Sequence, residues 1–279
     1  MAAPEMLEIG FNARLFPSNW RPVLDEIHFG AANGFVALQF PGKAEGLAAE
    51  HLGAEISVVR RALDAAGIVA VMEIVMGVDE RGYSAAGHTP HEVITANLPA
   101  IAGLHCRCVH FHFVQSAQVL PAQLPALENC LLASLDVAAG IGQEWGFQMG
   151  LEHNERDVGL FASPQACANI LSLVPQLNFV WDINHVHPDD QQGFHDLLPR
   201  ASMLHISDTR QPVTNEHLPL GMGTVDFVHA CATLRAANFA GPAILEIGGH
   251  PKSGGFGHDS DSALIGSRQR LMAAAKLGT

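Results

Sequence analysis

The stretch that decides the fold is Gly150-Leu151-Glu152-His153-Asn154, in which a short apolar run ends in a carboxylate. Three later segments repeat this pattern, namely Trp181-Asp182-Ile183-Asn184-His185, Met203-Leu204-His205-Ile206-Ser207-Asp208 and Ile244-Leu245-Glu246-Ile247. A run of Phe, Val, Leu and Ile indicates a buried strand, and burial of a charged residue at its end is costly unless a partner offsets the charge. These four endings in succession therefore predict strand ends that converge on one cation.

Short apolar runs alternate with longer amphipathic stretches along the whole chain, which predicts a parallel sheet of βα units. The expected strands are residues 7–12, 35–40, 68–75, 106–114, 147–152, 177–182, 203–207 and 242–247. The expected helices are residues 19–33, 53–66, 89–102, 122–139, 163–174, 191–198, 225–237 and 262–276, with Asn19, Thr89 and Ser163 as the residues that open three of them. Eight such units within about 250 residues match a closed barrel. The expected fold class is α/β, a single (β/α)8 TIM barrel, with residues 1–279 as one domain.

The residues at four consecutive strand ends, Glu152, Asp182, His205 and Glu246, form the expected metal site. Adjacent strands lie about 4.8 Å apart, so side chains at neighbouring strand ends of a tilted barrel can reach a common ion. Three carboxylates and one imidazole suit Mn²⁺ or Mg²⁺ best, with Zn²⁺ or Co²⁺ as alternatives. The competing interpretation is a set of salt bridges at the rim, and it is disfavoured because the chain has only 15 basic residues.

Composition limits the other classes of function. A hydrophobic content of 48% with 15% charged residues supports a large core, and the net charge of −13 disfavours nucleic acid as a partner. The odd number of cysteines, five, favours a reducing cytoplasm with free thiols. Met1-Ala2-Ala3-Pro4-Glu5 lacks the features of a signal peptide, and no apolar run reaches the ~18 residues that cross a bilayer, so we expect a cytoplasmic protein without a membrane partner. The 16 histidines point mildly to a metal.

Four cysteines and histidines alternate along the fourth expected strand, at Cys106, Cys108, His110 and His112. Alternation places them on one face of the strand, about 6.6 Å apart, which is too far for one ion to take more than two of them. We therefore expect them to pack in the barrel interior. His112 is the member expected to reach the open end and contact a substrate.

Several motifs resemble those of one known superfamily. They are Leu151-Glu152 with Asn154, Asp182-x-x-His185, His205-x-x-Asp208, the Leu220-Gly221-Met222-Gly223 turn before Asp226-Phe227, and Leu245-Glu246. Together they resemble the xylose isomerase-like barrels, in particular sugar isomerases and epimerases of the hydroxypyruvate isomerase and tagatose 3-epimerase kind. The resemblance implies one divalent metal bound by Glu152, Asp182, His205 and Glu246. It also implies that Glu152 and Glu246 form the catalytic acid–base pair and that His185 and Arg210 bind the substrate.

The sequence departs from the endonuclease IV branch of the same superfamily, which builds a three-metal cluster with additional histidines. The third expected strand offers Glu73 and no histidine, and Thr214-Asn215-Glu216-His217 stands where an Asp-x-His pair is expected. Together with the negative charge of the chain, this disfavours DNA repair.

The expected function is therefore a divalent-metal-dependent sugar isomerase or epimerase, which acts on a small ketose or hydroxy-carbonyl compound through an enediolate. Three alternatives stay open: a dehydratase of inosose type on the same metal, an endonuclease IV-like AP endonuclease, and a sugar-binding protein without turnover. The sequence leaves open the substrate and whether the chain forms a homo-oligomer.

Overall fold

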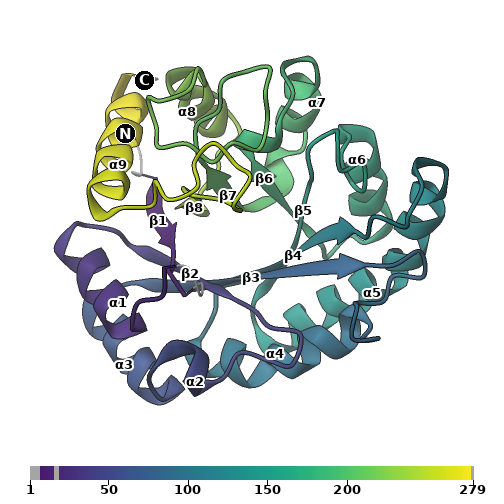
Figure 1. Ribbon diagram of the computed structural model, residues 1–279, viewed down its shortest axis with the longest axis horizontal. Coiled ribbons are helices and arrows are strands. Elements are labelled where there is room, and N and C mark those ends of the chain that lie inside the picture. The colour runs from purple at the N-terminus through teal and green to yellow at the C-terminus, as the bar shows by residue number, and fades with distance from the viewer. Residues whose placement is uncertain (1–6, 16–18, 278–279) are drawn as a thin grey trace.

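Eight parallel strands close into one barrel in the computed structural model, which describes residues 7–15 and 19–277 (Figure 1). The strands are β1 (Glu8–Asn12), β2 (Ala37–Pro41), β3 (Val69–Val78), β4 (Cys108–Gln115), β5 (Gln148–Glu152), β6 (Asn178–Asp182), β7 (Ala201–Ile206) and β8 (Pro242–Leu245). Each strand pairs in parallel with the next, and β8 pairs with β1. The expected (β/α)8 barrel is confirmed. The expectation that no signal peptide is present concerns residues 1–5, which lie outside the described part of the chain.

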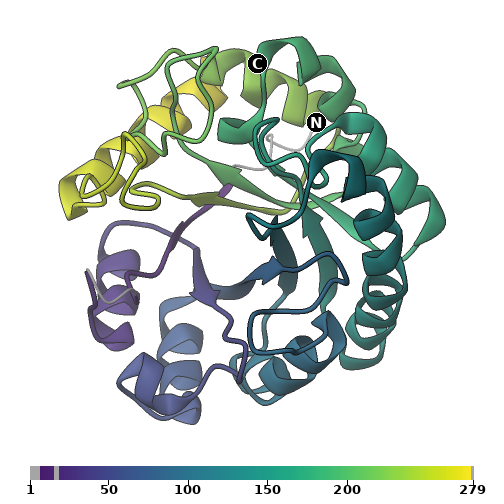
Figure 2. The ribbon, with the colours of Figure 1, turned by 45° about the vertical axis from the view of Figure 1, so that its right-hand side comes forward.

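Helices follow the strands and form a layer around the barrel (Figure 2). They are α1 (Val23–Ala32), α2 (Ala49–Leu52), α3 (Ile56–Ala66), α4 (Pro90–Leu104), α5 (Leu124–Trp145), α6 (Pro164–Leu173), α7 (Gln191–His195), α8 (Phe227–Ala236) and α9 (Asp261–Leu277). Short 3₁₀ turns span Pro121–Gln123, Ile183–His185, Pro188–Asp190 and Leu198–Arg200. The apolar core lies mainly between the strands and this layer of helices.

Two of the three expected helix caps are present. The side chain of Thr89 accepts a hydrogen bond from Glu92 N at the start of α4, and that of Ser163 accepts one from Ala166 N at the start of α6. The expectation for Asn19 is wrong, because α1 begins after Pro22 and the amide of Asn19 instead donates to Asp259 Oδ2 at 2.6 Å. A long-range polar contact thus replaces the local cap.

One helical segment, Pro121–Trp145, is long and apolar enough by length and composition to span a membrane among the described residues. In the barrel this segment packs through one face, on which Leu127, Leu131 and Leu135 are buried. Helices that cover the core of a barrel pass the same test of length and composition, so this feature alone assigns no membrane role.

Apolar side chains fill the barrel interior in one compact layer. Its members are Ala37, Val71, Cys108, Val180, Met203 and Ile244, and all are fully buried. Gly10 and Gly150 complete the layer on β1 and β5, where an added Cβ would lie 2.7 Å from the side chain of Ala37 and 2.9 Å from that of Val180, respectively. An added side chain at either position would therefore force its neighbours in the closed barrel to shift.

The structure corrects the prediction for the fourth strand in one respect. Cys108 lies in the interior layer as expected, but Cys106 precedes the strand and packs with the core between strands and helices. Period-two alternation holds only within a strand, and β4 begins at Cys108. Burial raises the pKa of the Cys106 thiol and raises that of Cys108 to about 11, so both are held as neutral thiols.

Candidate metal centre

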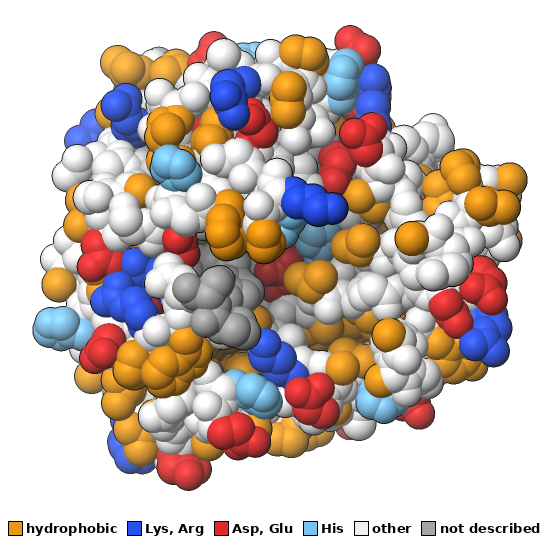
Figure 3. Space-filling view, viewed as in Figure 1, with side chains coloured by type: hydrophobic (Ala, Val, Ile, Leu, Met, Phe, Trp, Pro, Cys, Tyr) orange, Lys and Arg blue, Asp and Glu red, His pale blue; other side chains and the backbone are white. Residues whose placement is uncertain are grey.

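A polar layer lies directly above the apolar interior layer, on the side of the carboxyl ends of the strands. Each strand contributes the residue two positions after its interior residue, because side chains alternate between the two faces of a strand. The layer consists of Asn12, Gln39, Glu73, His110, Glu152, Asp182, His205 and Glu246. Figure 3 shows a depression near the centre of the face seen in Figure 1, with acidic and histidine side chains inside it.

Strand pairing places the predicted metal ligands at one height. Asp182 on β6 lies opposite His205 on β7 in the strand register. The backbone N–H of Glu246 donates to Ile206 O at 3.0 Å, which continues the pairing of β7 and β8 by one residue. Glu152 is the last residue of β5, next to β6. All four predicted ligands therefore lie at the end of the barrel where TIM-barrel sites are built.

The structure brings these four side chains together. Glu152, Asp182, His205 and Glu246 each offer one ligand atom, and these atoms all lie within 4.8 Å of one another. His205 Nδ1 lies 3.0 Å from Glu152 Oε1 and 3.1 Å from Glu246 Oε2, so both glutamates converge on the same point.

The donor set fits a divalent cation. Asp182 Oδ1 accepts the backbone N–H of Asn184 at 2.7 Å, whereas the buried Oδ2 has no hydrogen-bond partner among the described residues. His185 Nε2 lies 3.3 Å from Oδ2 but is not aligned to donate to it. A buried carboxylate oxygen without a partner is costly, and a cation bound by three carboxylates would remove this cost.

The carboxylates and the imidazole of the cluster shift one another's pKa values. Burial lowers the pKa of His205, but the charges of Glu152 and Glu246 raise it well above its usual value. Burial and the charges of both glutamates raise the pKa of Asp182 despite the opposing effect of His185. Burial also acts to raise the pKa of Glu246, but the charge of His205 and its hydrogen bond outweigh this effect and lower the pKa to about 2. In the metal-free protein the imidazolium of His205 thus partly neutralises the carboxylates.

Gln39 and Glu73 orient the His205 ring from the opposite wall of the barrel. Gln39 Nε2 donates to Glu73 Oε2 at 3.0 Å, so Gln39 Oε1 is left to accept the N–H of His205 Nε2 at 2.8 Å. This arrangement directs His205 Nδ1 to the carboxylates, where its lone pair is available to a metal once the proton has left. Neither Gln39 nor Glu73 was assigned this role from sequence.

His185 lies at the edge of the cluster, where its Nε2 is 3.3 Å from Asp182 Oδ2. Its Nδ1–H donates to His153 O at 3.0 Å, and its ring is almost fully buried. Burial lowers its pKa, but the charges of Asp182, Glu155 and Glu152 raise it above the usual value. Its role as a substrate ligand stays a prediction.

His112 lies at the open side of the polar layer, with 17% of its side chain exposed. Its Nε2–H donates to Asn154 Oδ1 at 2.8 Å, while the amide of Asn154 donates to Phe113 O and Leu160 O. His112 Nδ1 lies 3.3 Å from Glu73 and 3.4 Å from Glu152. Burial lowers its pKa, but the Glu152 charge and the hydrogen bond to Glu73 raise it to about 10. Its contact with a substrate stays a prediction.

Arg210 is not brought into the cluster. Its guanidinium forms a salt bridge with Glu216 and its side chain is 60% exposed. The described contacts of this guanidinium all go to Glu216. Glu216 in turn accepts the backbone N–H of Arg210 at 2.7 Å, so the pair closes a loop after β7.

Sequence reasoning missed two histidines that contact the predicted ligands. His110 Nε2 lies 3.1 Å from Glu152 Oε2, and its Nδ1 has no partner among the described residues. His217 Nδ1 lies 3.0 Å from Glu246 O and 3.8 Å from Glu246 Oε2. Strand alternation placed His110 on the correct face and could have indicated its contact, whereas His217 lies in a loop without periodicity and offered only its position near the expected Asp-x-His pair.

Asp208 has a different role from its neighbours in the motif. Its carboxylate accepts backbone N–H groups of Gly221 at 2.7 Å, Gly223 at 2.9 Å and Val225 at 3.1 Å. An added Cβ at Gly223 would lie 2.4 Å from Asp208 Oδ1, so this glycine is required for the close approach. Asp208 therefore shapes the loop after β7 and does not point at the cluster.

The comparisons with known proteins concern the fold and the family of the chain. Residues 27–268 match the family model described as a xylose isomerase-like TIM barrel. The solved structure of D-allulose 3-epimerase from Methylomonas sp. is similar at 16% identity with a TM-score of 0.77, over 98% of this chain and 100% of that chain. L-ribulose 3-epimerase is similar at 15% identity with a TM-score of 0.75, over 98% and 96% of the two chains.

An AP endonuclease of family 2 from Brucella melitensis is similar at 16% identity with a TM-score of 0.66, over 93% and 97% of the two chains. At such identities the likeness shows a shared fold. No curated protein matches the sequence. The closed barrel, the polar layer at its carboxyl end and the match over residues 27–268 establish that the chain belongs to the xylose isomerase-like TIM-barrel family.

Proposed function

We propose that this protein is a divalent-metal-dependent sugar isomerase or epimerase that moves a proton at a carbon next to a carbonyl group, through an enediolate. The observation that carries the proposal is the buried cluster of Glu152, Asp182, His205 and Glu246, with its partnerless carboxylate oxygen. The structural likeness to D-allulose and L-ribulose 3-epimerases supports the substrate class. Three carboxylates and one imidazole favour Mn²⁺ or Mg²⁺.

The residues of the metal centre would have separate roles in the proposed proton transfer. A bound divalent cation would polarise a carbonyl oxygen and stabilise the negative charge that develops during proton transfer. Glu152 and Glu246 reach the centre from β5 and from the end of β8, and each has a carboxylate oxygen within 3.1 Å of His205 Nδ1. One carboxylate can therefore remove the proton while the other returns it. His185 and His112 lie beside the cluster and would hold substrate oxygens.

Exchange of the substrate proton with solvent tests the acid–base assignment. When the protein is incubated in D₂O with Mn²⁺ and a ketose such as D-allulose or L-ribulose, we expect deuterium to replace the proton at the reacting carbon. NMR measures the rate of this exchange. Glu152→Gln and Glu246→Gln should each lower the exchange rate by about 10²–10⁴-fold. Glu144→Gln, at an exposed position on α5, is the matched control and should exchange as the wild type does. Exchange at the wild-type rate in either site variant would show that the assignment is wrong.

The nuclease alternative is favoured by one specific observation. Three further groups also have ligand atoms within 4.8 Å of one another: Glu73 with His110, Glu152 and His205; His112 with Glu152 and His185; and Asp182 with His185 and His217. A second and third ion could therefore bind beside the first. Elemental analysis of reconstituted protein separates the two functions: one metal per chain supports the isomerase, whereas two or three metals with cleavage of a duplex that contains an abasic site would support the nuclease.

A further inference from the structure

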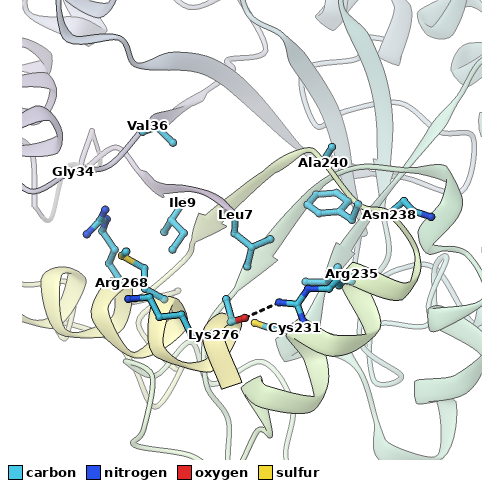
Figure 4. A pocket seen from close by; sticks show the side chains of 14 residues that line it. Leu7, Ile9, Gly34, Val36, Cys231, Arg235, Asn238, Ala240, Arg268 and Lys276 are labelled. Carbon is cyan, nitrogen blue, oxygen red and sulfur yellow. Dashed lines mark hydrogen bonds between the residues drawn. The ribbon is translucent and has the colours of Figure 1, made fainter. Parts of the chain in front are cut away.

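A second cavity lies at the opposite end of the barrel from the polar layer. Its volume is ≈ 470 Å³, and it is formed by the start of β1, the residues before β2, the loop before β8, and helices α8 and α9 (Figure 4). This volume lies within the range of about 300–1,000 Å³ that is typical of sites for small molecules. The proposed isomerase has no use for it, because the catalytic residues are at the carboxyl ends of the strands.

The described lining of this cavity combines apolar walls with positive charge. The apolar side chains are Leu7, Ile9, Val36, Leu234, Phe239 and Met272. The charged lining residues are Arg235, Arg268 and Lys276, and no Asp or Glu is among the described residues that line the cavity. Of these three, Arg268 is partly buried and its Nε has no hydrogen-bond partner, and a partly buried cation without an anion nearby is costly. The cavity therefore offers its most favourable environment to a molecule that is apolar and carries one negative group.

Arg268 is the cation on which this inference depends. It rises from α9 toward Gly34, and its guanidinium lies 5.7 Å from the centroid of the Phe35 ring (Figure 4). Its buried Nε has no hydrogen-bond partner, and no hydrogen bond or ion pair joins Arg268 to another described residue. The guanidinium of Arg235 differs, because it donates to Ala275 O at 2.6 Å. The five donors of a guanidinium rarely stay unused at a partly buried position.

We propose that this cavity binds a small amphiphilic carboxylate, with the aliphatic body against the apolar walls and the carboxylate on Arg268. The planar guanidinium matches a carboxylate through two parallel hydrogen bonds. The straight chain of a medium-length fatty acid can pack against the apolar side chains of the cavity and leaves its single charge at one end. This site is separate from the proposed active site, so its existence does not depend on the isomerase assignment.

Titration calorimetry of the full chain with octanoate tests the proposal. We expect octanoate to bind with one site per chain and 1-octanol, which has the same apolar body without the charge, to bind more weakly. Arg268→Met keeps the apolar stem of the side chain and should weaken octanoate binding by at least about tenfold, since it removes a charge-assisted hydrogen-bonded pair. Arg270→Met, on the same helix but outside the lining, is the matched control and should leave the affinity unchanged. Val36→Trp should block the cavity and abolish binding.

Other occupants would overturn the proposal by distinct results. Equal binding of octanoate to the wild type and to Arg268→Met, or of octanol and octanoate to the wild type, would remove the assigned role of the charge. Binding to a chain that lacks residues 1–6 but not to the full chain would assign the cavity to the chain's own amino-terminal segment. A dimer that Val36→Trp dissociates in sedimentation would assign it to a second copy. Thermal unfolding of each variant verifies that it is folded.

Discussion

Replacement of Asp182 by Asn should stabilise the metal-free protein, although most substitutions at buried positions destabilise. The buried Oδ2 of Asp182 has no hydrogen-bond partner, and burial together with the charges of Glu152 and Glu246 raises the pKa of this carboxyl. A raised pKa means that folding disfavours the charged form, so loss of the charge removes a cost of folding at neutral pH. The amide oxygen of Asn can still accept the N–H of Asn184, and the amide carries no charge that Glu152 and Glu246 would repel.

The expected gain in the free energy of unfolding equals the cost of burying one polar group without a partner, about 1–3 kcal/mol. At about 2.1 cal/mol/K per residue, a chain of 279 residues has an unfolding entropy of about 0.6 kcal/mol/K. The Tm of metal-free Asp182→Asn should therefore exceed that of the metal-free wild type by about 2–5 °C.

Mn²⁺ should stabilise the wild type much more than the Asp182→Asn variant. At a Mn²⁺ concentration about 100-fold above Kd, the wild type gains about 2.7 kcal/mol, or a rise in Tm of about 4–5 °C. Mutation of a residue that only supports a metal ligand weakens metal binding by up to about 100-fold. Loss of a ligand itself should therefore weaken Mn²⁺ binding by at least about 100-fold. At the same Mn²⁺ concentration the variant then gains only about 0.4 kcal/mol, which is less than about 1 °C in Tm.

Differential scanning calorimetry with chelator and with Mn²⁺ measures both effects, and Asp157→Asn at an exposed position is the control. A metal-free Asp182→Asn protein that melts below the wild type would show that the carboxylate has a partner in solution. An undiminished rise of its Tm with Mn²⁺ would show that Asp182 is not a ligand. Either result would refute the reasoning.

Three further predictions concern the support of the site and of the barrel. Gln39→Leu removes the acceptor that orients His205 and should weaken Mn²⁺ binding by about 10–100-fold in titration calorimetry, while the number of sites stays the same. Thr89→Ala removes the cap of α4 and should lower the free energy of unfolding by about 1 kcal/mol in urea denaturation; an unchanged midpoint would contradict the capping role. Asp261 should make the stability depend on pH. Burial acts to raise its pKa, but the hydrogen bond from Arg14 outweighs this effect, so the pKa lies below 3.8. Because the folded-state pKa is lowered, the charged carboxylate stabilises the protein above pH 3.8, and this contribution is lost as the pH falls through the folded-state value. The free energy of unfolding of the wild type should therefore exceed that of Asp261→Asn at neutral pH. The two values should converge at acid pH.

The sequence by itself determined the fold class and the set of residues at the carboxyl ends of the strands. Parallel βα units place all strand ends at one end of the barrel, and period-two alternation decides which side chains point inward. For this reason Glu152, Asp182, His205 and Glu246 could be grouped although the last lies 94 positions after the first. Local hydrogen bonds likewise made the caps at Thr89 and Ser163 predictable.

Only the tertiary structure decided which partners these residues have. Gln39 orients His205, which lies 166 positions later in the chain, and His110 contacts Glu152 from the neighbouring strand. Arg210 is engaged by Glu216, and the path of that loop depends on contacts that no periodic pattern encodes. Strand periodicity fixes the direction of a side chain but not the residues that meet it from other strands, since that depends on register and on the closure of the barrel.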